Sequence, residues 1–283
     1  MDKPLSDRWS WHFYKKLCMF IDANDKQNAG RVESVTPGLV MPDIANVAIG
    51  SGKRMTASVL FFDLADFSRI THLISRDDTL RILNLIIPTV MRIARNWNGE
   101  IEKNTGDGIM AIFGTRSRDK ATIARDAVEC AMAIRYTMVN EIQQRLSRQN
   151  LPSMNFRIGI DMDELLIARI GINNNSFLSA VGDAANRASK LQSLAEANGI
   201  SIGEYVFHNL HTELHKYCDQ GSHPSWEWTI RDTKLEYRFF HFRHDWVEPL
   251  RGVSLKQGPN LQSKKVESSN PALAKIWPKG FGT

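Results

Sequence analysis

The chain has 283 residues, of which 42% are hydrophobic and 24% charged, and its net charge at pH 7 is +5. This composition allows one sizeable core with extensions or two small domains. The basic excess is mild and no run of Lys or Arg stands out, so nucleic acid is not expected as a partner. The three cysteines, Cys18, Cys130 and Cys218, are widely separated. Neither a signal peptide nor an apolar run of membrane-spanning length is present, and a cytoplasmic location is predicted.

Residues 1–55 are predicted to form an amino-terminal arm, aromatic at first and rich in loops later. The segment from Trp9 to Ile21 is amphipathic, a composition that also suits a membrane surface. Such segments more often pack against their own domain or a dimer partner, and we favour that interpretation. Residues 22–53 are rich in Gly, Asn, Asp and Pro, which is typical of loops.

The next predicted element is a strand at 58–62, an apolar, β-prone run that ends at Asp63. A long stretch with helical periodicity follows it. Two further strands, at 100–104 and 109–113, flank a turn that contains Asp107. In a strand–helix–hairpin unit, the last strand can lie beside the first and run antiparallel to it. Asp63 and Asp107 would then be neighbours.

Two neighbouring carboxylates repel each other, and a shared proton or a divalent cation relieves the repulsion. The helix start after Asp63 offers free backbone N–H groups, which favour an anion. Carboxylates that hold magnesium beside such a helix start suit a nucleoside triphosphate. Alternatively, Asp63 only caps the helix and Asp107 belongs to an ordinary turn. The presence of both residues at strand ends favours the metal site.

The rest of the chain is predicted to be mainly helix and strand, followed by a polar tail with little structure. In chain order we expect a helix at 119–149, a strand pair at 154–161 and 165–170 around a turn at 162–164, an exposed loop at 173–176, a helix at 183–197 capped by Asn198-Gly199, a helix at 205–217, strands at 226–230 and 237–242, and the tail at 246–283. The main domain is placed at 56–245.

One cluster suggests a different metal. His208, His211, His215 and Cys218 would share one face of a helix at 205–217 and could form a zinc set. A surface or dimer-contact face is favoured, because structural zinc ligands usually come from more than one element.

Four motifs resemble those of a known family, in its order and at plausible spacings. They are LFFDLADFS around Asp63, EKNTGDGIMAIFG around Asp107, FRIGID at 156–161 and AVGDAANRASKL at 180–191. The family is the class III nucleotidyl cyclase catalytic domain, and the resemblance covers about residues 56–245. It implies an α+β, ferredoxin-like βαββαβ fold with helices on one face of a mainly antiparallel sheet. It also implies conversion of a nucleoside triphosphate to a 3′,5′-cyclic nucleotide and pyrophosphate, with two Mg²⁺ or Mn²⁺ ions per site.

The resemblance gives individual residues roles in metal, phosphate, ribose and base binding. The metal-binding positions are matched by Asp63, Leu64 and Asp107, and the phosphate-wrapping positions by Phe67 and Ser68. The ribose-orienting asparagine is matched by Asn186, and the residue that contacts the reacting phosphate by Lys190. The base-reading positions are matched by Lys103 and Ser179, and the basic residue for the triphosphate tail by Arg231 or Lys234. The sequence departs from the family at Asp66, where Gly is frequent, at 162–164, where the family has a Gly-containing turn, and at Lys190, where most relatives have arginine.

The resemblance implies that the choice of base depends on Lys103 and Ser179, of which Ser179 can donate or accept and decides little. A lysine only donates hydrogen bonds, so it disfavours the ring N–H of guanine and leaves adenine, cytosine and uracil. The short organisation and the departures above resemble the pyrimidine cyclases of bacterial Pycsar antiphage systems, which implies cUMP or cCMP as a messenger for a separate effector. The alternatives are an adenylate cyclase acting on ATP and, in another class, an inactive nucleotide-sensing or dimerisation module. Since the family pairs two domains head to tail, a homodimer with shared active sites is expected.

Overall fold

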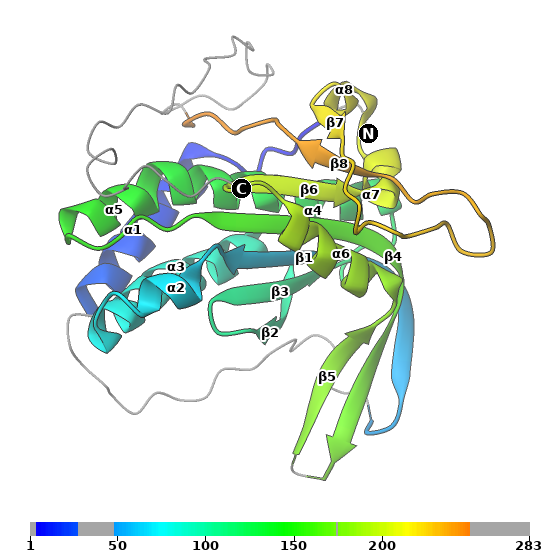
Figure 1. Ribbon diagram of the computed structural model, residues 1–283, viewed down its shortest axis with the longest axis horizontal. Coiled ribbons are helices and arrows are strands. Elements are labelled where there is room, and N and C mark those ends of the chain that lie inside the picture. The colour runs from blue at the N-terminus through cyan, green and yellow to red at the C-terminus, as the bar shows by residue number, and fades with distance from the viewer. Residues whose placement is uncertain (1–3, 28–47, 174, 250–283) are drawn as a thin grey trace.

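The structure is a computed structural model that describes residues 4–27, 48–173 and 175–249 (Figure 1). Its centre is an eight-stranded sheet in the order β2-β3-β1-β4-β6-β8-β7, with β5 paired to β4. The ladders between these strands are antiparallel, except that of β4 with β6. The order β2-β3-β1-β4 is that of a ferredoxin-like unit, and the predicted α+β class with a mainly antiparallel sheet is confirmed.

The strands are β1 (Gly52–Leu64), β2 (Glu100–Asn104), β3 (Gly108–Phe113), β4 (Phe156–Ile172), β5 (Asn175–Val181), β6 (Gly199–Gly203), β7 (Cys218–Gln220) and β8 (Phe239–Phe242). The helices are α1 (Trp11–Gln27), α2 (Phe67–Thr71), α3 (Arg76–Asn96), α4 (Lys120–Thr137), the π-helical turn η2 (Met138–Ile142), α5 (Gln143–Arg148), α6 (Asp183–Leu194), α7 (Glu204–Asn209) and α8 (Thr212–His215).

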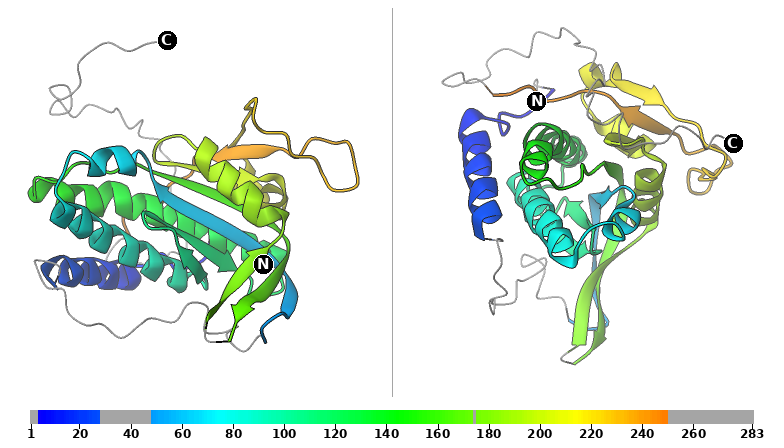
Figure 2. Two further views of the ribbon diagram at one scale, coloured as in Figure 1. Left: turned by 60° about the horizontal axis from the view of Figure 1, so that its bottom comes forward. Right: turned by 60° about the vertical axis from the view of Figure 1, so that its left-hand side comes forward.

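Helices cover both faces of the sheet, whereas the sequence predicted helices on one face (Figure 2). On one side, Leu60 and Phe62 of β1 belong to the large core that also contains buried side chains of α3 and α4. On the other side, Val59 packs with Ala184 and Ala188 of α6. Because β1 is apolar on both faces, each face is covered by helices. A strand buried on both faces has a nearly continuous run of apolar residues in its sequence.

Helix α6 approaches the sheet closely at Gly159 of β4. A Cβ atom there would collide with the carbonyl oxygen of Ala188 and the backbone nitrogen of Gln192. The absence of a side chain at this position therefore sets how deeply α6 sits on β4.

The substitution Gly159→Ala is expected to lower the free energy of unfolding by about 1–3 kcal/mol, because helix backbone has to move away from the strand. Urea unfolding followed by circular dichroism measures the change. Gly52→Ala is the control, since the nearest atom to its new methyl group is the movable end of the Leu166 side chain. Equal losses in the two variants would contradict the close-approach explanation.

The predicted strand pair around a turn at 162–164 is wrong. β4 continues unbroken from Phe156 to Ile172 and pairs with β1 along the whole length of β1. Met162 is buried on one face of β4, and Asp163, on the other face, is paired with Arg187 of α6. The polar residues that suggested a turn are therefore neutralised inside a strand. The actual turn lies further on, between β4 and β5, and the predicted loop at 173–176 runs partly into β5.

Other boundaries also differ from the prediction. The long helical stretch after Asp63 is divided into α2 and α3, and the Ser75 side chain caps α3 by accepting a hydrogen bond from the Asp78 N–H at 3.0 Å. Helix α6 ends at Leu194, so Asn198, although left-handed with φ 61°, does not cap it. The predicted helix at 205–217 is α7 and α8, residues 226–230 form only a bridge at Thr229, and β6 and β7 were not predicted.

Helix α1 packs against its own domain, as favoured from the sequence. Tyr14, Leu17 and Ile21 are buried in the large core, and the Tyr14 hydroxyl donates to Glu141 at 2.5 Å. Just before the helix, Trp9 stacks on Trp246 with 5.9 Å between ring centroids. The division into residues 1–55, 56–245 and 246–283 stays a prediction, although both ends of the described chain contribute to one core.

Parts of two predicted regions, the loop-rich stretch at 28–47 and the tail at 250–283, lie outside the described residues. Within the part of the chain that the structure describes, no helix combines the length and the apolar character needed to cross a bilayer.

Candidate active site

Asp63 and Asp107 lie at the same edge of the β1–β3 ladder. Asp63 is the penultimate residue of β1, and its register partner is Gly108, the residue after Asp107. The backbone confirms the proximity, because the Leu64 N–H donates to the Asp107 carbonyl oxygen at 3.3 Å. The structure thus brings the two predicted carboxylates together.

The Asp63 carboxyl group is half-buried and electrostatically unfavourable in its charged form. Burial, and then repulsion from Asp107, raise its pKa to about 6, while Arg157 and a hydrogen bond from Gln192 act in the opposite direction. That hydrogen bond is long, with 3.4 Å between Gln192 Nε2 and Asp63 Oδ2. A cation bound between Asp63 and Asp107 would remove the repulsion.

The surroundings of Asp63 suit a magnesium or manganese ion. A Cβ at Gly108 would come within 2.8 Å of Asp63 Oδ1, so glycine keeps the space beside this oxygen open. Among the described residues, no group of three or more His, Cys, Asp or Glu side chains is arranged to bind a metal. Mg²⁺ commonly takes one or two carboxylates, with substrate phosphates and water completing its shell. The pair fits that pattern. The Leu64 side chain is buried in the core, which leaves only its backbone carbonyl as a ligand.

The chain after β1 bends sharply before α2. Asp66 adopts a left-handed conformation with φ 58°. Glycine enters this region without steric cost and aspartate tolerates it, which explains why the family often has Gly here. The Asp66 side chain makes no cap hydrogen bond to α2 and lies 3.9 Å from Arg69. Phe67 and Ser68 follow directly, half-buried and exposed respectively, and only a few residues after Asp63.

Arg157 is a candidate site residue that the sequence analysis did not single out. It is the register partner of Asp63 on β4 and lowers the pKa of the Asp63 carboxyl. Its Nε atom is buried and makes no hydrogen bond to any described residue. A signal was available in the FRIGID motif, because strand alternation separates Arg157 from the core residues Phe156 and Ile158.

Asn186 and Lys190 lie on α6 and do not face the sheet of their own chain. The buried positions of α6 are Ala184, Arg187, Ala188 and Leu191, whereas Asn186 is exposed and Lys190 half-buried. These two side chains are one helical turn apart and are available to a second copy of the chain.

The predicted base-reading residues lie on two different strands. Lys103 of β2 is half-exposed, and its Nζ lies over the Phe61 ring at 5.9 Å from the centroid. Ser179 of β5 is half-buried and pairs in register with Ala168 of β4.

Arg231 is exposed and lies near the amino-terminal end of α6, where its Nη2 donates to Asp183 Oδ2 at 2.7 Å. Gln192, which contacts Asp63, is nine residues further along α6, or about 13 Å at the rise of an α-helix. Within one chain, Arg231 therefore lies with the Asn186 end of the helix and not beside Asp63. The other candidate, Lys234, is exposed.

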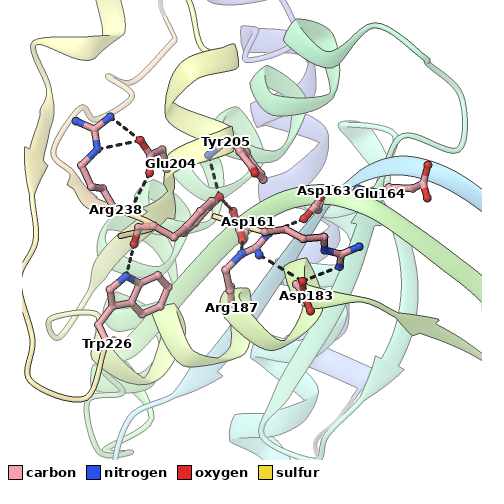
Figure 3. A network of polar contacts seen from close by, with 11 residues as sticks. Asp161, Asp163, Glu164, Asp183, Arg187, Glu204, Tyr205, Trp226 and Arg238 are labelled. Carbon is pink, nitrogen blue, oxygen red and sulfur yellow. Dashed lines mark hydrogen bonds and ion pairs between the residues drawn. The ribbon is translucent and has the colours of Figure 1, made fainter. Parts of the chain in front are cut away.

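A buried ionic network fastens α6 to β4 (Figure 3). Arg187 donates to the fully buried Asp161 and, at 2.9 Å, to Asp163 Oδ2. Tyr237 completes the network by donating its hydroxyl proton to Asp161 Oδ1 at 2.6 Å. Burial raises the pKa of Asp161, and its partners Arg187 and Tyr237 oppose that rise. The helix that carries Asn186 is thus held in one position by charge as well as by packing.

The four residues considered as a zinc set do not share one helical face. His208 contacts Glu204, His211 Nδ1 accepts from the Glu213 N–H, His215 contacts the Phe207 carbonyl oxygen and Cys218 Sγ contacts the Leu214 carbonyl oxygen. They come from α7, the α8 cap, α8 and β7, because the predicted single helix is broken. The favoured alternative, a surface or dimer-contact face, stays a prediction.

Comparison with known proteins identifies a family. Residues 51–224 match the adenylate and guanylate cyclase catalytic domain. Among curated relatives, a uridylate cyclase from Rhodovulum sp. (strain MB263) is 24% identical over 217 residues, covering 73% of this chain and 88% of the relative. A cytidylate cyclase from Staphylococcus aureus is 27% identical over 150 residues, covering 52% of this chain and 36% of the relative.

Among solved structures, the adenylyl cyclase CyaB from P. aeruginosa aligns with a TM-score of 0.60 at 21% identity, covering 71% of this chain and all of that chain (100%). At this level of identity the alignment establishes the fold.

Proposed function

The chain belongs to the adenylate and guanylate cyclase catalytic domain family, and we propose that it cyclises a nucleoside triphosphate to a 3′,5′-cyclic nucleotide and pyrophosphate. The observation that carries this proposal is the half-buried pair of Asp63 and Asp107 with Arg157 opposite Asp63. A purely structural module would have no need to keep two repelling carboxylates together. The pair therefore supports a site that binds a metal and a nucleotide, and relatives named cytidylate and uridylate cyclase support an enzyme over a sensor.

In the proposed reaction the ribose 3′-hydroxyl attacks the α-phosphorus in line with the leaving pyrophosphate, so the protein supplies no nucleophile. Divalent ions held by Asp63, Asp107 and the Leu64 carbonyl would neutralise the triphosphate and acidify the hydroxyl. Arg157, opposite Asp63 on β4, would attract the phosphates by its charge, and Phe67 and Ser68 would wrap them.

The site is proposed to be completed by a second copy of the chain. Asn186 faces away from its own sheet, so it and Lys190 would orient the ribose and contact the reacting phosphate of the site on the partner chain. Arg231, at the same end of α6, would approach the triphosphate tail from the partner as well. A head-to-tail homodimer with two equivalent sites satisfies these placements.

We propose a pyrimidine triphosphate, UTP or CTP, as the substrate. Relatives named uridylate and cytidylate cyclase support this choice, and the donor-only Lys103 disfavours GTP. The product would be a second messenger read by a separate effector in antiphage defence, as the resemblance to pyrimidine cyclases implies. ATP is the second candidate, since fold likeness extends to an adenylyl cyclase.

The test is incubation of the purified protein with Mn²⁺ and each of UTP, CTP, ATP and GTP, followed by chromatography of the products. Cyclic UMP or cyclic CMP together with pyrophosphate is the expected result. Cyclic AMP as the main product would replace the substrate assignment, and no cyclic product with any of the four would refute the activity.

Metal affinity is expected to depend on pH, because a proton competes with the metal for Asp63. With a pKa of about 6, this carboxylate is charged above that pH and increasingly protonated below it. The Mn²⁺ association constant should therefore be nearly constant from pH 7 to 8 and fall roughly tenfold per pH unit below pH 6. Electron paramagnetic resonance of free Mn²⁺ measures it without turnover. An affinity that stays constant down to pH 5 would contradict proton competition at Asp63 near pH 6.

A further inference from the structure

A buried carboxylate with no assigned role lies between the two strands that carry the base-reading positions. Glu102 of β2 has only 3% of its side chain exposed. Its Oε1 accepts a hydrogen bond of 3.2 Å from the Ala180 N–H of β5. Ala180 is the neighbour of Ser179, so Glu102 contacts the backbone beside one base-reading position.

The same carboxylate faces the other base-reading position. Lys103 Nζ lies 3.8 Å from Glu102 Oε2, and this oxygen is buried without a hydrogen bond to any described residue. At that distance the ammonium group is attracted without giving up a donor, because 3.8 Å is too long for a hydrogen bond. Lys103 therefore keeps its three N–H donors for a ligand.

The backbone of β2 is irregular at this point. The β2–β3 register shifts between Ile101 and Lys103, which makes Glu102 the extra residue of a β-bulge. A bulge redirects side chains, and here it allows consecutive residues to act together, with Glu102 reaching β5 and Lys103 lying over Phe61.

The charge on Glu102 requires an explanation, because burying a carboxylate costs several kcal/mol unless partners compensate. An uncharged amide would accept the Ala180 N–H equally well. An amide would attract the Lys103 ammonium group much less strongly, because it carries no net charge. The burial of a charge in this position therefore points to Lys103.

We propose that Glu102 is a positioning residue for base selection. It holds the Lys103 ammonium group and the Ser179 segment of β5 at a fixed distance from each other. This inference rests on the proposed function, in which Lys103 and Ser179 read the base. A loose Lys103 would accept any base that offers an acceptor, whereas a fixed one favours the base whose acceptor lies at the right place.

The test uses Glu102→Gln, which keeps an acceptor for Ala180 but removes the charge. Its matched control is Glu100→Gln, another buried glutamate of β2, which is paired with Arg116 at 3.2 Å. Calorimetry with 3′-deoxy-UTP, 3′-deoxy-CTP and 3′-deoxy-ATP plus Mn²⁺ measures binding in the absence of cyclisation, since these probes lack the attacking hydroxyl. The KM and kcat values for the natural triphosphates and the urea unfolding curves are measured in parallel.

Glu102→Gln is expected to weaken binding of the preferred probe about tenfold, the effect of losing one well-placed contact, and to reduce the discrimination among bases. KM should rise while kcat changes less than about threefold, and Glu100→Gln should keep wild-type selectivity. In a Lys103→Met background, Glu102→Gln should have no further effect on selectivity.

Unchanged base discrimination in a folded Glu102→Gln variant would overturn the proposal, as would an equal loss of kcat for every nucleotide. If Glu102→Gln does not fold, the milder Glu102→Asp replaces it. The proposal would then be overturned if the effects of Glu102→Asp and Lys103→Met on base selectivity were additive in the double variant. A wild-type protein that binds the probes selectively but makes no cyclic product would refute the proposed activity and leave the binding comparison valid.

Discussion

Replacing Asp63 with asparagine is expected to reduce turnover by at least about a thousandfold while the protein stays folded. Groups that stabilise transition-state charge are commonly worth factors of this size, and the amide cannot neutralise a divalent cation. The shape of the side chain is preserved, so the β1–β3 and β1–β4 ladders are unaffected. The kcat value for the preferred triphosphate with Mn²⁺ measures the loss.

The stability of the same variant gives a second, independent readout. Because burial and Asp107 raise the pKa of Asp63, its charge disfavours the folded state at pH 7. Removing that charge should leave the unfolding midpoint unchanged or raise it. Glu164→Gln is the control, an exposed carboxylate of β4 paired with Arg54 at 3.1 Å, and it should retain turnover. A folded Asp63→Asn variant with near-normal kcat would exclude Asp63 as a metal ligand.

Replacing Arg187 with methionine should lower the free energy of unfolding by about 3–5 kcal/mol, because it leaves a fully buried Asp161 without its cation. The effect should be smaller in the double variant with Asp161→Asn, in which no unpaired charge remains. Urea unfolding of the single and double variants measures both losses of unfolding free energy.

The control for this experiment is Arg54→Met, which removes an exposed ion pair with Glu164. Exposed pairs contribute at most about 1 kcal/mol. If Arg187→Met and Arg54→Met destabilise the protein equally, the network in Figure 3 does not hold α6 in place.

The central part of the fold could be predicted because its signals are local. The apolar run that ends at Asp63 predicts the second half of β1, although its first half, from Gly52, was assigned to the arm. The hairpin around Asp107 predicts β2 and β3, and one rule of chain topology then brings the two carboxylates together. No long-range information was needed for that step.

The β4 strand could not be recognised as one element for the opposite reason. Asp163, in the predicted turn at 162–164, looks like a turn residue until Arg187, more than twenty positions later, is known to pair with it. The face covered by α6 was missed in the same way, since Ala184 and Ala188 make a weak apolar stripe that reaches the sheet only because position 159 has no side chain.

Arg157 and Glu102 were missed because their significance is three-dimensional. In the sequence, each is one charged residue in a strand pattern. Only the register that sets Arg157 opposite Asp63, and the bulge that turns Glu102 toward β5, distinguishes them from surface residues.

The packing of Trp9 and Trp246 beside α4 affects how deletion experiments should be designed. Trp9 Nε1 donates to the Val247 carbonyl oxygen at 2.9 Å. Trp97 Nε1 donates to the Glu129 side chain of α4 at 2.8 Å. A fragment trimmed to the family match at 51–224 would lose Trp9, Tyr237 and Trp246 and open an aromatic surface to water. Inactivity of such a fragment would combine the loss of this packing with the loss of Arg231, so catalytic roles are better assigned by point substitutions in the 283-residue chain.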